Sequence, residues 1–167
     1  HMISLGSRLA VAYNLRRFYN FRSAFPFDWW ISSASGITEL LRCPDIETLY
    51  DPSQLELGSR AETVRHRSLD IQLHHEFPRD ATKPNGPVRP DWLQHLERPK
   101  ARTAALFNKF VGLNKSGNRI AFFREQPDQD DPFTVHLDAL FPNADYTLVF
   151  IPAINAGMGD SFNWKGN

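Results

Sequence analysis

The chain has 167 residues, of which 41% are hydrophobic, and its 19 Lys and Arg residues balance 19 Asp and Glu residues. This length and apolar content favour one globular domain, and the neutral balance argues against nucleic acid or a membrane surface as a partner. Cys43 is the single cysteine, which excludes an intrachain disulfide and a cysteine metal cluster. Because no apolar run reaches the roughly 20 residues of a membrane-spanning helix, a cytoplasmic protein is expected.

The first predicted elements are a short buried strand at 3–5 and a helix that starts shortly after Gly6. Ser7 is placed to cap this helix. The apolar residues of the helix are spaced four and three apart and form one stripe, which consists of Val11, Leu15 and Phe18. Leu9 lies roughly 200° from Val11 around the helix axis, so it points away from the stripe.

The rest of the chain alternates between predicted strands and helices. The predicted strands cover 68–74, 119–125 and 146–151, and the predicted helices cover 37–43, 101–115 and 132–141. Several prolines between 78 and 100 predict a long surface loop. We expect a single α/β domain over residues 3–156, with this loop at 78–100 inside it and an irregular tail at 157–167.

Apolar strands that alternate with amphipathic helices are typical of a three-layer α/β domain. Its sheet is expected to be mostly parallel, with about four strands and with helices on both faces. Ligands of such sheets bind beyond the carboxyl ends of the strands. The polar segments that follow the predicted strands are 6–8, 74–76, 124–125 and 152–155. The sequence therefore predicts that these segments converge on one crevice.

One side of the predicted crevice has candidate anion-binding groups. Gly6 permits a sharp turn from strand to helix, and the N–H groups at the start of the helix suit an anion or an oxyanion. Arg8 and Arg124 would add positive charge there. A simpler interpretation stays open, because serine and glycine are also common cap and turn residues.

The other side has candidate groups for acid–base chemistry. His75 is a candidate general base, and His74 is a candidate ligand-binding residue. If the strand continues through both, only one of them faces the site. Asp28 lies among aromatic residues, so it needs a partner such as a histidine or an arginine. The other histidines lack metal-ligand spacing, and we expect neither a metal nor another cofactor.

Three motifs resemble a bacterial family described as papain-like cysteine peptidases of unknown function. They are SLGSR at 4–8, PFDWW at 26–30 and HHEF at 74–77. The resemblance reaches from Ile3 to about Glu125. It implies a cysteine at the third position after the glycine, where this chain has Leu9, and HDF where this chain has HEF. Cysteine in the first turn of a helix would be an activated thiolate, whereas leucine has no such chemistry.

Three hypotheses about function follow. The first is a hydrolase-related protein that lacks the nucleophile and binds a small molecule or a peptide. The second is a serine hydrolase in which Ser7 is the nucleophile, His75 the base and Asp28 the orienting acid. The third is a module that binds an anionic small molecule, such as a phosphorylated sugar or a nucleotide. The oligomeric state stays open.

Overall fold

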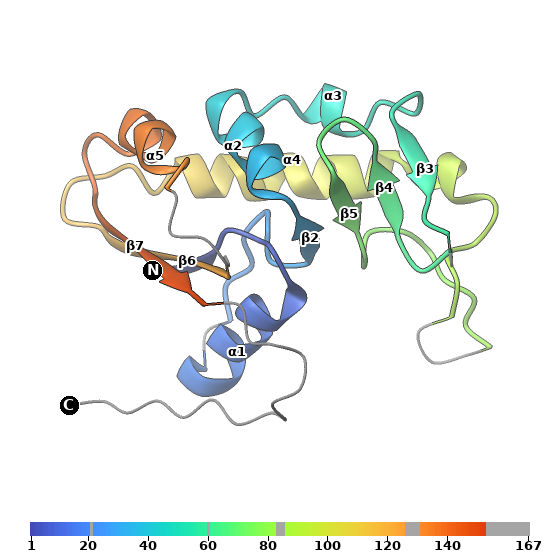
Figure 1. The fold of residues 1–167 in the computed structure, drawn as a ribbon, viewed down its shortest axis with the longest axis horizontal. Helices are drawn as coiled ribbons and strands as arrows, with labels where there is room; N and C mark the ends of the chain where they lie inside the picture. The colour runs from blue at the N-terminus through green and yellow to red at the C-terminus, as the bar shows by residue number, and fades with distance from the viewer. Residues whose placement is uncertain (21, 60, 83–85, 126–130, 153–167) are drawn as a thin grey trace.

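The structure, a computed structural model, describes residues 1–20, 22–59, 61–82, 86–125 and 131–152. It is a mixed α/β fold whose strands form two separate sheets (Figure 1). The parallel sheet has the order β1-β6-β7, with β1 at Met2–Ser4, β6 at Arg119–Glu125 and β7 at Asp145–Ile151. The antiparallel sheet has the order β2-β5-β4-β3, with β2 at Trp30–Ser32, β3 at Leu55–Leu57, β4 at Val64–His66 and β5 at Ile71–Leu73.

The helices surround these two sheets. Their bounds are Leu9–Tyr19 for α1, Ala34–Arg42 for α2, Ile46–Leu49 for α3, Glu97–Val111 for α4 and Thr134–Leu140 for α5, and a 3-10 helix, η1, spans Trp92–His95. In Figure 1, α4 (yellow) runs along the long axis of the molecule, from the side of the parallel sheet to the side of the antiparallel sheet. Within the described ranges, every helix is too short or too polar to cross a membrane.

The core connects the two sheets through α4. The ring of Phe110 in α4 packs edge-on against Phe27, which precedes β2, at 5.5 Å between ring centroids. The same ring packs against Phe122 of β6 at 6.0 Å and against Phe141, just after α5, at 5.1 Å. Burial of such aromatic side chains is a major source of folding free energy. The two sheets therefore share one hydrophobic core.

The α/β class predicted from the sequence is confirmed, but the single sheet of about four mostly parallel strands is wrong. The segment predicted as a strand at 68–74 contains β5, and β5 lies between β2 and β4 in the antiparallel sheet. The reason is that β2, β3 and β4 have three residues each. Strands this short carry almost no alternation pattern, so the sequence does not predict the strands that pair with β5.

The predicted loop at 78–100 contains local structure in its described residues, including the single turn that the sequence predicts near 92–96. Arg79 and Val88 form an isolated antiparallel bridge, and η1 follows. Helix α4 begins at Glu97, so the last residues of the predicted loop are helical. Pro99 is tolerated there because the first turn of a helix has no intrahelical acceptor for its N–H groups. The predicted tail at 157–167 lies outside the described residues.

Candidate functional site

The turn after β1 is fastened to the antiparallel sheet. Gly6 and Ser7 both have positive φ, 77° and 79°, which turns the chain sharply into α1. The Ser7 N–H donates to Ser32 Oγ at 3.0 Å, and the Ser32 N–H donates to the Ser7 carbonyl at 3.3 Å. Ser7 is not the cap of α1, as the sequence suggested. The N-cap position is occupied by Arg8, whose side chain makes no capping hydrogen bond.

Arg124 is a buried cation between the two sheets. Its side chain is 3% exposed, and its two terminal nitrogens donate to the Leu5 carbonyl at 2.6 Å and to the Ser32 carbonyl at 2.9 Å. Burial lowers the pKa of its guanidinium to about 10, so the group stays protonated at neutral pH. Its Nε has no hydrogen-bond partner among the described residues. Arg124 thus contributes to joining the sheets.

Arg8, the other predicted anion ligand, also has a partner. Its Nε lies 3.4 Å from Glu125 Oε1, and the Arg8 side chain is largely exposed. This ion pair confirms that the segments after β1 and after β6 meet at one edge of the parallel sheet. The third segment expected there, 152–155, lies outside the described residues except for Pro152.

The two histidines lie together, directly after β5. The sequence predicted that only one would face the site, but the strand ends at Leu73, so alternation no longer separates their side chains. His74 Nδ1 and His75 Nε2 are 3.1 Å apart, and the His75 ring packs edge-on against Trp29 at 5.5 Å. Burial lowers the pKa of each imidazole, with a further contribution from the positive charge of Arg79. Both rings are therefore mainly neutral at pH 7.

Asp28 is partnered by an arginine. Its Oδ2 accepts from Arg16 at 2.7 Å and from the Phe25 N–H at 3.0 Å. Desolvation raises the pKa of the Asp28 carboxyl in spite of these hydrogen bonds. The Arg16 guanidinium also lies over the Trp29 ring at 4.9 Å. Trp29 thus contacts both Arg16 and His75, and Asp28 makes no hydrogen bond to a histidine in the described part of the chain.

Ser7 and His75 lie toward opposite ends of β2. Ser7 is bonded to Ser32, the last residue of β2, whereas His75 contacts Trp29, just before the first. Trp29 and Ser32 are three residues apart along an extended strand, which corresponds to about 10 Å. A general base must lie within about 3 Å of its nucleophile, or one water away. The structure therefore brings Ser7 together with Arg8, Leu9 and Arg124, and it brings His75 together with His74.

Glu76 is a buried acid to which the sequence analysis assigned no role. Its carboxylate accepts a hydrogen bond from Trp30 Nε1 at 3.3 Å, while its Oε2 has no hydrogen-bond partner among the described residues and lies 3.9 Å from Arg102. Desolvation raises the pKa of this carboxyl, because the burial outweighs the effect of Arg102. The signal that could have found it is the charged residue inside the otherwise aromatic and apolar motif HHEF.

The raised pKa of Glu76 makes the unfolding free energy depend on pH. The folded protein binds a proton at Glu76 more tightly than the unfolded chain does. The resulting contribution to the unfolding free energy is present at acidic pH, and it is lost as the pH rises through the pKa of the folded state. We expect Glu76→Gln to raise the melting temperature at pH 7.5 relative to the unaltered protein, and this gain to vanish near pH 4. Thermal unfolding at both pH values measures this. Glu97→Gln, at an exposed position, is the control; an equal effect in both variants would contradict the prediction.

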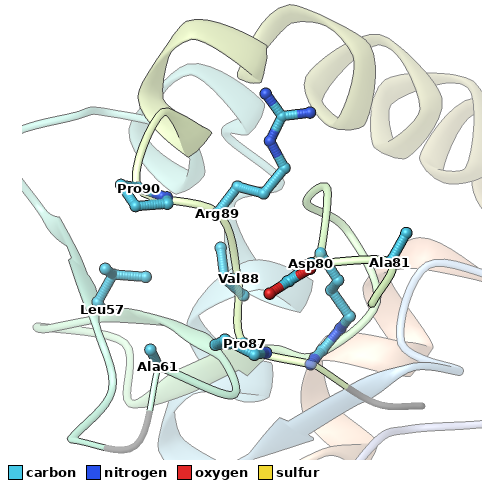
Figure 2. Close-up of a pocket in the computed structure, with 9 residues that line it drawn as sticks. Leu57, Ala61, Asp80, Ala81, Pro87, Val88, Arg89 and Pro90 are labelled. Carbon is cyan, nitrogen blue, oxygen red and sulfur yellow. The ribbon is translucent and has the colours of Figure 1, made fainter. Parts of the chain in front are cut away.

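A separate open pocket lies beside the loop at 78–100. Its volume is about 670 Å³, and its walls come from the turn after β3 and from both arms of the loop. Figure 2 shows Leu57 and Ala61 on one side and Pro87, Val88 and Pro90 along the other. The three charged residues at the pocket already have partners: Arg89 pairs with Asp91, Arg79 donates to three backbone carbonyls, and Asp80 accepts hydrogen bonds from Thr82.

Together, the fold and these contacts define a two-sheet α/β protein with polar groups at the junction of its sheets. No protein-family model matches the chain, and no solved structure matches it. The chain is similar to "Uncharacterized protein R408" of Acanthamoeba polyphaga mimivirus, at 26% identity over 190 aligned positions. These cover 97% of this chain and 80% of that protein.

Proposed function

We propose that this protein is a non-hydrolytic, ligand-binding relative of the papain-like cysteine peptidases that its motifs resemble. The observation that supports this proposal is the position of Leu9, which is the first residue of α1. A cysteine at this position would lie at the positive end of the helix dipole, where a thiol ionises readily. Leucine occupies that position here and offers neither a nucleophile nor a proton.

The other candidate nucleophiles do not replace the missing thiol. Cys43 lies at the C-terminal cap of α2, a different helix from the one that begins at Leu9. Ser7 is bonded through its backbone to Ser32, about three strand residues away from the anchor of His75. His75 in turn shares its Nε2 with His74. Among the described residues, the contacts of Ser7 and of His75 thus lie at opposite ends of β2, which argues against His75 as the base for a nucleophile at Ser7.

The same turn is suited to holding a ligand without cleaving it. The N–H of Val11 already donates to the Arg8 carbonyl at 3.4 Å, but Arg8 provides no side-chain cap, so the N–H groups of Leu9 and Ala10 are candidate donors for a carbonyl or carboxylate oxygen. Arg8 lies at this helix start, and its side chain is 59% exposed although its partner Glu125 is only 11% exposed. The exposed guanidinium has five N–H donors in all, so it can bind a ligand oxygen while it keeps its contact with Glu125. A small molecule or a peptide that carries such an oxygen fits this site.

The experiment introduces a thiol at position 9 and measures whether the start of α1 lowers its pKa. In a Cys43→Ser background, we expect the Leu9→Cys thiol to react with iodoacetamide at lower pH than the Tyr13→Cys thiol, by about one pKa unit. Tyr13 is the matched control, because it is exposed and lies one turn further along the same helix face. The rate of alkylation against pH gives both thiol pKa values.

The protein with Leu9 intact is tested in parallel. We expect it to leave generic peptide and ester substrates unchanged and to show no labelling of Ser7 by a fluorophosphonate. Turnover of those substrates, or labelling of Ser7, would refute the non-hydrolytic proposal. Equal pKa values for the thiols at positions 9 and 13 would show that the start of α1 does not activate a nucleophile, and would remove the observation on which the proposal rests.

A further inference from the structure

We infer that His74 and His75 form a chelating site for a divalent transition-metal ion of the Cu²⁺, Ni²⁺ and Zn²⁺ group. The inference is independent of the proposed function, because it concerns the opposite end of β2 from Leu9. The two histidines follow β5 directly, and their rings lie at an interplanar angle of 66° with 4.4 Å between centroids. Two side chains of the ligand type that these metals prefer are thus already together.

The spacing of the two nitrogens matches a shared metal. His74 Nδ1 and His75 Nε2 are 3.1 Å apart. With metal–nitrogen bonds of about 2.0–2.1 Å, two nitrogens lie about 2.9 Å apart at a square-planar corner and about 3.3 Å apart along a tetrahedral edge. The observed spacing falls between these values. A metal ion can therefore replace the hydrogen bond without a change in the distance between the two nitrogens, once the rings rotate so that both lone pairs point at the metal.

The hydrogen bond between the rings places one proton on a nitrogen that the metal would need. One ring carries this proton on the nitrogen that faces the other ring. When two neutral imidazoles bind a metal ion, the proton moves to the other nitrogen of the same ring, so no net release of a proton is needed. Both side chains are at least partly exposed, so water can carry the proton.

Neighbouring contacts hold the pair in place before the metal arrives. The His74 carbonyl accepts a hydrogen bond from Arg79, and the His75 ring is fixed against Trp29. Such support around the ligands raises metal affinity, because less side-chain freedom is lost on binding. The charges of Arg79 and Arg102 oppose a cation, and Glu62 near His74 offsets them in part.

The remaining coordination positions are open. Among the described residues, no cluster of three or more His, Cys, Asp or Glu side chains is suited to a metal. Water or an anionic ligand would complete the coordination, and the positive charge of Arg102 favours an anion there. The other histidines are placed differently: His66 is buried and bonded to the Thr48 carbonyl, and His95 is paired with Asp91.

The test is titration of metal-free protein with Cu²⁺, followed by the fluorescence of tryptophan. Bound Cu²⁺ quenches nearby indoles, and Trp29 is in contact with His75. We expect a saturable loss of emission that is greatly reduced in Trp29→Phe. Truncating either ligand, in His74→Ala or His75→Ala, is expected to weaken binding by about tenfold or more, because half of the protein ligand set is removed.

A control variant is needed because the amine and imidazole of His1 can also chelate copper. All proteins therefore carry His1→Ala, and circular dichroism checks that each variant is folded. Electron paramagnetic resonance of the Cu²⁺ complex is expected to show two imidazole nitrogens, and one in His74→Ala. Equal affinities for the His74→Ala, His75→Ala and parent proteins, or a spectrum without imidazole coupling, would overturn the inference.

Discussion

Arg124→Leu is expected to lower the free energy of unfolding by about 3 kcal/mol. The guanidinium of Arg124 donates to the Leu5 and Ser32 carbonyls, which belong to the ends of two different sheets. Removing a charged donor from a buried acceptor costs roughly 1–3 kcal/mol for each group left unpaired. Part of this loss is offset, because the variant no longer buries a charge that has no carboxylate partner among the described residues. Urea denaturation at neutral pH measures the difference.

Two control variants test whether the effect comes from the bridge itself. One removes another arginine of the same strand, and the other keeps the positive charge of Arg124. Arg119→Leu changes an exposed arginine of the same strand, and its effect is expected to stay within about 0.5 kcal/mol. Arg124→Lys keeps the charge but cannot donate to both carbonyls at once. It is expected to fall between the parent protein and Arg124→Leu. If the free energy of unfolding of Arg124→Leu equals that of the parent protein, the two sheets are held together without this bridge.

Gly6→Ala is expected to destabilise the protein by about 3 kcal/mol. Gly6 has φ of 77°, a conformation that costs an L-residue roughly 1–2 kcal/mol. A Cβ at this position would also overlap Ser32 Oγ, which accepts the hydrogen bond that fastens the turn. Forcing an extra methyl into such a contact costs about 1–3 kcal/mol more. The same denaturation experiment gives the sum of the two effects.

Gly117→Ala isolates the backbone part of that effect. Gly117 has φ of 85°, and a Cβ there meets no described atom within 4 Å. We expect a loss of about 1 kcal/mol for this variant. In a Ser32→Ala background, where the overlapping hydroxyl is gone, Gly6→Ala should cost little more than Gly117→Ala. If Gly6→Ala costs the same with and without Ser32 Oγ, the close contact does not constrain the turn.

The parts of the fold that the sequence predicts well are those with long periodic patterns. Strands β6 and β7 have seven residues each, and both were predicted to within one residue. The stripe of α1 was only partly right, because Val11 and Leu15 are buried while Phe18 is 63% exposed. Near the end of a helix the core no longer covers the stripe, so periodicity alone overestimates how far burial extends.

The candidate site depended on an assumption that local patterns cannot test. The segments after β1 and β6 do meet, as the contact of Arg8 with Glu125 confirms. The sequence predicts the histidines at the same edge only on the assumption that β5 is a parallel neighbour of β1 and β6. Partner and direction of a strand depend on residues far away in the chain. Proximity of Ser7 to His75 was therefore beyond what the sequence could establish.

The pairing of β1 with β6 also bears on how the protein is made. Met2 pairs with Ala121, so β1 leaves the ribosome long before β6, the strand with which it pairs, is synthesised. The hairpins that join β3, β4 and β5 are local and can form in the nascent chain meanwhile. Until β6 emerges, the apolar residues of β1 stay uncovered, which makes this N-terminal stretch a natural target for molecular chaperones during translation.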